Sequence, residues 1–149
     1  MDLDRHLPAR LRTRDATWWA TRAHWLSLIV AFGFLNWVDR HQWFNADEWG
    51  FLVDRGLFPK GDDLGLLAPH NEHWSTVPVL GYRLLFSIFG VRTYLPYVVV
   101  LLLVHLLVAH LLWRVLRRVG VEDWFATVAI ALFLVLGVGW ENLTAAFQW

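Results

Sequence analysis

The sequence predicts an all-α membrane protein with three transmembrane helices and a long outer loop that carries two short interfacial helices. Of its 149 residues, 57% are hydrophobic, whereas ordinary soluble domains contain roughly 45–50%. Three uncharged apolar runs occur, and most of the 11 Trp residues lie near the ends of these runs, as in the aromatic belts of membrane proteins. The formal net charge is zero, which argues against nucleic acid and leaves the lipid bilayer as the expected partner.

The first predicted transmembrane helix covers residues 23–38, after a basic tail of residues 1–22. This run is short for a bilayer crossing, unless the helix begins near Trp18 and Arg22 extends its guanidinium to the lipid headgroups. No small-residue cleavage site follows Val38. We therefore expect an uncleaved anchor rather than a signal peptide.

The loop of residues 39–93 is predicted to carry two short helices. Asn45 and Glu48 have the spacing of a capping box, which predicts a helix over residues 46–57. A second helix is predicted over residues 76–89, because Pro78 suits a first turn and a glycine follows the last apolar position. Both are too short to cross a bilayer, so we expect them to lie along its outer surface.

Two further spans are predicted over residues 94–113 and 124–140. The first is about twenty residues without a formal charge, the length that a helix needs to cross the hydrocarbon core. The second is shorter but also uncharged. Residues 141–149 then form an outer end with neither a charged tail nor a helix stop. We therefore expect the chain to be a fragment of a larger polytopic bundle.

The distribution of arginine predicts the orientation. The tail of residues 1–22 contains five arginines, and the connection of residues 114–123 contains three. Because cytoplasmic segments carry an excess of Lys and Arg, we expect both on the cytoplasmic side of the plasma (inner) membrane. The loop of residues 39–93, with five basic and seven acidic residues, is then extracytoplasmic.

Asp47 and Glu48 are the strongest candidate site residues in the outer loop. Acidic residues are common in the first turn of a helix, where they cap backbone N–H groups. The functional alternative is a general base or a ligand of a divalent cation. Neighbouring residues on a helix point about 100° apart, so at most one of the two would be the base. The sequence leaves both interpretations, and the need for a metal, open.

A second polar cluster contains His70, Glu72 and His73. Imidazole and carboxylate can bind Zn, Mn or Fe, but the spacing differs from the HExxH pattern that places two ligands on one helical face. We therefore expect hydrogen bonds to the protein or to a substrate. Arg83 could hold a phosphate, because a guanidinium matches phosphate oxygens bidentately, or it could extend to lipid headgroups.

Several segments of the outer loop together resemble a known family. These are Trp43–Trp49 (WFNADEW), His70–Leu80 (HNEHWSTVPVL), Tyr82–Phe86 (YRLLF) and Tyr94–Tyr97 (YLPY). With a cytoplasmic N-terminus, one span and an Asp-Glu pair at the start of a large outer loop, they resemble the opening part of a GT-C-type membrane glycosyltransferase. That superfamily includes the protein O-mannosyltransferases and the aminoarabinose transferases.

The resemblance implies an enzyme that transfers a sugar from a polyprenyl-phosphate donor to an acceptor hydroxyl on the outer face of the membrane. Asp47 would remove the acceptor proton, and Glu48 would order the loop or bind a divalent cation. His70 and His73 would lie near the donor phosphate, and Arg83 would neutralise it. The donor pocket of such enzymes needs later spans, so we expect the 149 residues alone not to catalyse transfer.

The alternative is a non-enzymatic polytopic membrane protein, such as a transporter or an assembly subunit. A transporter is expected to place ionisable groups near the bilayer midplane. His105 and His110 lie within the second predicted span but about 140° apart on the helix, and we interpret them as packing or substrate-pathway residues. An enzyme would instead concentrate ionisable groups at the outer interface, and their distribution in this sequence favours the enzyme.

Overall fold

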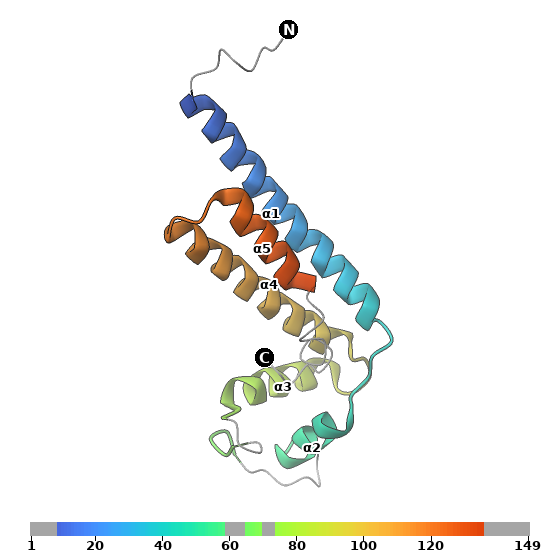
Figure 1. Cartoon of the computed structure of the whole chain (residues 1–149). Helices are drawn as coiled ribbons and strands as arrows, with labels where there is room; N and C mark the ends of the chain where they lie inside the picture. Colours follow the sequence, from blue (N-terminus) through green and yellow to red (C-terminus); the bar gives the residue numbers. More distant parts are fainter. Residues whose placement is uncertain (1–8, 59–64, 70–73, 136–149) are drawn as a thin grey trace. The chain divides into compact units, whose positions relative to one another are not determined.

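The computed structural model of the protein describes residues 9–58, 65–69 and 74–135, and its secondary structure there is helical (Figure 1). Five helices follow one another along the chain: α1 (Ala9–Asp39), α2 (Ala46–Asp54), α3 (Thr76–Phe89), α4 (Leu95–Arg118) and α5 (Asp123–Val135). The prediction of an all-α protein is confirmed for this part of the chain.

Three helix boundaries within the described residues differ from the sequence-based expectations by more than one residue. Helix α1 begins at Ala9 rather than at residue 23, because the intervening residues contain no Gly or Pro and include good helix formers. Helix α2 ends at Asp54 rather than at residue 57, where Gly56 adopts a φ of 65° that stops the helix. Helix α4 continues to Arg118, and Gly120 with a φ of 90° follows it. Helix α3 covers the range expected for it.

Helix α4 is long and apolar enough to cross a membrane, and it is the one helix of the described residues that meets this criterion. Helices α3 and α5 are apolar but shorter, with 14 and 13 residues. The span predicted over residues 124–140 extends beyond the described residues, as does the outer end at residues 141–149. The three-span arrangement therefore stays a prediction.

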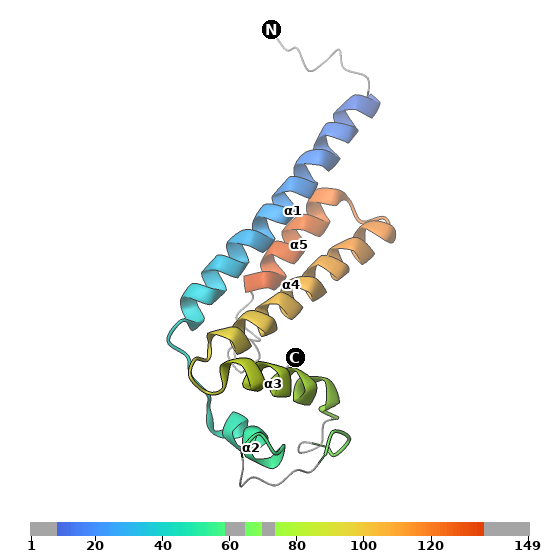
Figure 2. The ribbon, with the colours of Figure 1, turned by 180° about the vertical axis from the view of Figure 1, so that it is seen from behind.

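The chain divides into two compact units. The first, called here the hairpin unit, contains residues 1–34 and 105–137. Within it, most of α1, the C-terminal part of α4 and α5 lie side by side (Figures 1 and 2). Its buried core consists of small and large apolar side chains from all three helices: Leu28, Ala31, Ala109, Trp113, Ala126, Ile130 and Leu134.

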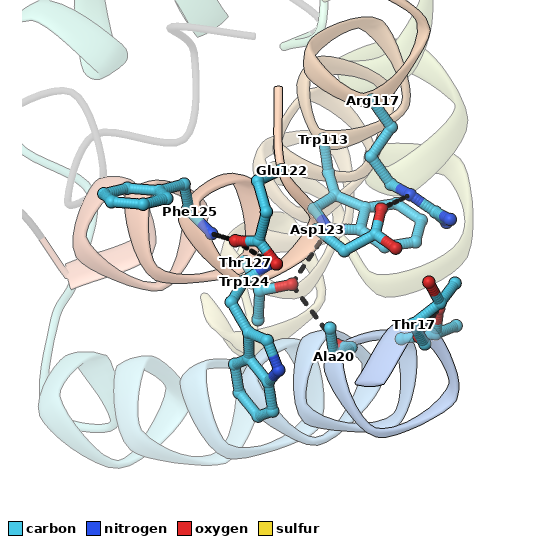
Figure 3. Close-up of polar contacts among 10 residues, drawn as sticks. Thr17, Ala20, Trp113, Arg117, Glu122, Asp123, Trp124, Phe125 and Thr127 are labelled. Carbon is cyan, nitrogen blue, oxygen red and sulfur yellow. Dashed lines mark hydrogen bonds and ion pairs between the residues drawn. The ribbon is translucent and has the colours of Figure 1, made fainter. Parts of the chain in front are cut away.

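One buried polar chain joins the three helices of the hairpin unit (Figure 3). The indole Nε1 of Trp113 in α4 donates a hydrogen bond to Thr127 Oγ1 in α5 at 3.1 Å. The same hydroxyl donates to the backbone oxygen of Ala20 in α1 at 3.2 Å. Thr127 therefore uses both its donor and its acceptor capacity, and no polar atom of this chain is left unsatisfied.

The second unit, called here the loop unit, contains residues 35–104 and 138–149. Its described part includes α2, α3 and the N-terminal part of α4. Phe44 is buried and contacts Tyr94 and Tyr97 edge to face, with ring centroids 4.7 and 5.0 Å apart. Tyr97 also donates a hydrogen bond to the Gly90 carbonyl at 2.9 Å. Aromatic side chains thus pack around the start of α4.

Candidate functional site

Helix α2 begins in a cap that the sequence predicted. Asn45 has extended backbone angles, as an N-cap residue requires. The Glu48 carboxylate, three residues later, accepts a hydrogen bond from the Asn45 backbone N–H at 2.9 Å through Oε2. This bond satisfies a backbone donor that the helix itself leaves unpaired, and it holds the Glu48 side chain against the N-terminus of α2.

The other oxygen of Glu48 accepts hydrogen bonds from two tyrosines. Tyr82 in α3 donates its hydroxyl to Glu48 Oε1 at 2.8 Å, and Tyr94, just before α4, donates to the same oxygen at 2.7 Å. We call Asn45, Glu48, Tyr82 and Tyr94 the Glu48 hub. These hydrogen bonds join α2 to α3 and to the start of α4, and a buried hydroxyl that lost its acceptor would cost about 1–3 kcal/mol.

Three members of the Glu48 hub are buried, and Asn45 is exposed. Glu48 and Tyr82 have no exposed surface, and Tyr94 is 2% exposed. Burial, followed by the nearby Glu48 carboxylate, raises the pKa of the Tyr82 hydroxyl, so this group stays protonated as a donor. A carboxylate that already accepts three hydrogen bonds has little capacity left for a metal or a substrate. Of the roles that the sequence left open for Glu48, ordering the loop fits this geometry best.

Asp47 lies in the first turn of α2, immediately before Glu48. Its backbone is held between the two ends of the cap, because Asn45 precedes it and Glu48 follows it. The Asp47 side chain lies outside the described part of the structure, as do His70 and His73. Their predicted roles as base and as substrate-binding residues stay predictions.

Arg83, the remaining residue of the predicted site, connects α3 to the end of α2. Its Nη2 donates a hydrogen bond to the Arg55 backbone oxygen at 3.1 Å. Arg55 is itself fully buried and donates from Nη1 to the Gly65 carbonyl at 2.9 Å. The two arginines thus connect α3, Arg55 at the end of α2 and Gly65. This contact places Arg83 in the same unit as Glu48.

Asp39 is a candidate acid that the sequence did not single out. It is the first residue of the loop after the predicted span, and only 4% of its surface is exposed. Its Oδ2 has no hydrogen-bond partner in the described part of the chain. Burial raises the pKa of this carboxyl from 3.8 to about 6. A group that titrates near neutral pH is suited to proton transfer, but its position after an apolar run gave no such indication.

Three histidines of the hairpin unit pack against aromatic rings. His110 Nδ1 lies 3.1 Å from His24 Nε2, so one nitrogen donates and the other accepts. The His24 ring stacks on Trp113 with centroids 4.2 Å apart, and His105 stacks on Phe133 at 5.1 Å. These contacts fit the packing role expected for His105 and His110. The partner, His24, is 86 residues away from His110, and no local pattern could have indicated it.

Comparisons of the chain with family models, curated proteins and solved structures find no match. Among the described residues, no group of three or more His, Asp or Glu side chains could hold a metal ion. The divalent cation that Asp47 and Glu48 could bind stays a prediction, since Asp47 contributes no described side chain. The candidate site therefore rests on the Glu48 hub and on the backbone that it holds.

Proposed function

We propose that the chain is the N-terminal portion of a GT-C-type membrane glycosyltransferase, which transfers a sugar from a polyprenyl phosphate to an acceptor hydroxyl on the outer face of the membrane. The observation that carries this proposal is the Glu48 hub. It contains Glu48, the second member of the Asp-Glu pair that the resemblance implies is catalytic, and it holds the helix turn to which Asp47 belongs. A rigid support of this kind is what a positioned general base requires.

The hub supports the proposal because it joins segments that are distant in the sequence. Tyr82 and Tyr94 lie 34 and 46 residues beyond Glu48. They fix the N-terminus of α2, and with it the backbone of Asp47, relative to α3 and the start of α4. A surface helix whose only purpose was to lie on lipid would not need two buried hydrogen bonds from distant tyrosines to one of its carboxylates.

Exposed apolar side chains on three helices of the hairpin unit support the proposed membrane spans. Soluble monomers rarely expose large apolar patches, whereas lipid-facing helix surfaces are apolar by necessity. The exposed residues lie on α1 (Leu26, Ile29, Val30, Phe34), α4 (Leu107, Val108, Leu111) and α5 (Phe125, Val128, Leu132). We infer that α1 and α5 cross the bilayer together with α4, with the N-terminus on the cytoplasmic side of the inner membrane.

In the proposed reaction, Asp47 accepts the proton of the acceptor hydroxyl while the hydroxyl oxygen attacks the anomeric carbon of the donor. A new glycosidic C–O bond forms, and the bond between the anomeric carbon and the phosphate oxygen breaks. The polyprenyl phosphate leaves with the electron pair. Arg83, His70 and His73 would stabilise its negative charge, because donors to a developing anion lower the barrier.

The proposal is tested by replacing Asp47 in the full-length protein. Membranes that contain the Asp47→Asn protein should transfer at least about a hundredfold less labelled sugar from polyprenyl-phosphate mannose or polyprenyl-phosphate aminoarabinose, because removal of a general base costs about 10²–10⁴ in rate. Asp54→Asn, the same change at the other end of α2, is the matched control and should retain activity. A well-expressed Asp47→Asn protein with normal transfer would overturn the assignment of the base.

The topology is tested with single cysteines, because the natural chain has none. Leu67 in the outer loop and Val119 between α4 and α5 are 73% and 71% exposed, so they form a matched pair. A membrane-impermeant thiol reagent added outside should label Leu67→Cys in intact cells, and Val119→Cys only after the membrane is opened. Equal labelling of both from outside would contradict the crossing by α4.

A non-enzymatic transporter is the second candidate, and the contact between the buried His24 and the half-buried His110 favours it. Ionisable pairs within membrane helices often mark substrate or proton pathways. The two candidates differ in which residues matter. A transporter would lose function in His110→Gln and keep it in Asp47→Asn, whereas the enzyme would show the reverse.

A further inference from the structure

A pocket of about 460 Å³ opens in the hairpin unit beside the C-terminal end of α4. Three of its lining residues are Arg114, Arg117 and Arg118, and we call it the arginine pocket. Residues separated by three and four positions share one face of a helix, so these arginines form one basic surface. The volume lies in the range of about 300–1,000 Å³ that small-molecule sites occupy.

The acidic residues next to the arginine pocket are already engaged (Figure 3). Asp123 Oδ1 forms an ion pair with Arg117 Nε at 2.5 Å. Glu122 Oε2 accepts hydrogen bonds from the backbone N–H groups of Trp124 and Phe125, both at 3.0 Å, and so caps α5. Of these two carboxylates, Asp123 neutralises the charge of Arg117, and Glu122 caps the N-terminus of α5.

Arg114 and Arg118 are left with uncompensated charge. Both side chains are exposed, and neither is paired with a carboxylate within the residues that the structure describes. With Asp123 as the one acid in the lining, the arginine pocket has an excess of two positive charges. An anion would therefore be attracted to it.

The wall of the arginine pocket is aromatic. Trp25 and Trp113 line it together with His110, and the Arg117 guanidinium lies 4.5 Å from the centroid of the Trp113 ring. Tryptophan beside arginine at the end of a transmembrane helix is typical of the headgroup region of a bilayer. The ligand should therefore combine an anionic group with an apolar part.

We propose that the arginine pocket binds the phosphate of an anionic phospholipid headgroup. Two guanidiniums on one helical face can each bind phosphate oxygens bidentately, and basic pockets between transmembrane helices on the cytoplasmic side are suited to acidic lipid headgroups. Helix-dipole compensation accounts for cations in the last turn of α4. It does not account for a hollow beside them. The inference rests on the membrane placement proposed above and is independent of sugar transfer.

Native mass spectrometry of the full-length protein in detergent tests this inference. Wild-type protein should retain phosphatidylglycerol in preference to phosphatidylcholine. The Arg114→Gln/Arg118→Gln protein should bind phosphatidylglycerol about 30-fold more weakly, because each arginine near anionic lipid contributes roughly a fivefold gain in affinity. The Arg114→Lys/Arg118→Lys protein keeps both positive charges but lacks the planar guanidinium groups that bind phosphate bidentately. It should bind phosphatidylglycerol more tightly than the double Gln protein and more weakly than wild type.

The matched control is Arg40→Gln/Arg92→Gln, which removes two exposed arginines outside the pocket. It should retain the lipid as wild type does. Equal loss in the control, or unchanged binding in the Arg114→Gln/Arg118→Gln protein with unaltered thermal unfolding, would overturn the inference. Displacement of the lipid by glycerol 1-phosphate at equal concentration would show that the site binds soluble phosphates, and would also overturn it.

Discussion

The loop unit and the hairpin unit are stabilised in opposite ways. In the loop unit, a fully buried carboxylate accepts three hydrogen bonds, and a fully buried arginine donates to a backbone carbonyl. In the hairpin unit, seven apolar residues form the core, and the polar chain through Thr127 contains no charge. Buried charges cost free energy unless they are fully hydrogen-bonded.

This difference indicates in which unit a single substitution should lower the stability of the protein most. Apolar cores tolerate substitutions of similar volume, whereas a polar network fails when one member is removed, because the others stay buried without partners. The stability of the loop unit therefore depends on particular hydrogen-bonding atoms. The stability of the hairpin unit depends on the volume and shape of its apolar side chains. The candidate site residues Asp47, Glu48 and Arg83 lie in the unit with the stricter requirement.

The largest expected effect comes from Glu48→Ala. The change leaves the Tyr82 and Tyr94 hydroxyls buried without their acceptor, which should lower the free energy of unfolding by about 2–6 kcal/mol, because each unsatisfied buried donor costs about 1–3 kcal/mol. Tryptophan fluorescence during denaturation in detergent measures this loss. Glu48→Gln keeps the shape and one acceptor oxygen, so it should lose less. A loss below about 1 kcal/mol for Glu48→Ala would show that the Glu48 hub does not stabilise the loop unit.

Asp39→Asn should stabilise the protein at neutral pH. The carboxyl has a pKa of about 6 in the folded state and 3.8 otherwise, so folding favours its protonated form. Its contribution to stability is complete below about pH 4 and is lost as pH rises to about 6. Asparagine imitates the neutral form, and the gain at pH 7 should be up to about 3 kcal/mol.

Thermal unfolding of wild type and Asp39→Asn at several pH values checks this prediction. The two melting temperatures should converge near pH 4 and separate as the pH approaches 7. Parallel curves over the whole range would contradict a raised pKa for Asp39.

Thr127→Val should have a smaller effect, because it removes one polar chain within a mainly apolar unit. Interhelical hydrogen bonds in membranes contribute on average about 0.6 kcal/mol, with a maximum near 1.7 kcal/mol. Thr21→Val is the matched control, since the Thr21 hydroxyl donates only to the Thr17 carbonyl of its own helix, at 2.8 Å. A loss for Thr127→Val as large as that for Glu48→Ala would remove the contrast between the units.

The smallest expected effect is that of Asp123→Asn, which breaks the ion pair with Arg117. The two side chains are 20% and 31% exposed, and ion pairs with this access to solvent contribute about 0.2–1 kcal/mol. Unfolding measured at low and at high salt separates the ionic part, because the difference from wild type should decrease as salt screens the charges. A difference that is unaffected by salt would contradict an ionic contribution.

Local patterns predicted the features that depend on neighbouring residues. Asn45 and Glu48 indicated the start of α2, and the proline and glycine around α3 indicated its limits. In contrast, the tyrosine partners of Glu48 are 34 and 46 residues away. From the sequence alone, the tryptophans of the loop were equally possible hydrogen-bond donors to Glu48. Hydrogen bonds between distant segments depend on packing, which periodicity and capping preferences do not contain.

For the candidate site too, the sequence indicated local features but not contacts between distant segments. Asp47 and Glu48 stood out because two adjacent acids follow an apolar run. Their spacing did not indicate that Glu48, rather than Asp47, accepts the hydrogen bonds of the Glu48 hub. Asp39 was missed because a charged residue after an apolar run is ordinary. Its burial, with 4% of its surface exposed, is a property of tertiary packing that a local pattern does not contain. The contact of Arg83 with phosphate or lipid stays a prediction, and its hydrogen bond to the Arg55 carbonyl joins positions 28 residues apart, which no spacing pattern indicated.

The short turn between α4 and α5 has a consequence for the order of assembly. The contacts across it close small loops: Arg117 and Asp123 are six residues apart, and Trp113 and Thr127 are 14 apart. The contact between His24 and His110 spans 86 residues. Because short loops cost less entropy to close and local contacts form sooner, α4 and α5 pair as soon as both have been synthesised. Helix α1 is synthesised first but can pack only after α4 and α5 have been made. Until then, the surface of α1 that contacts them in the folded protein stays exposed.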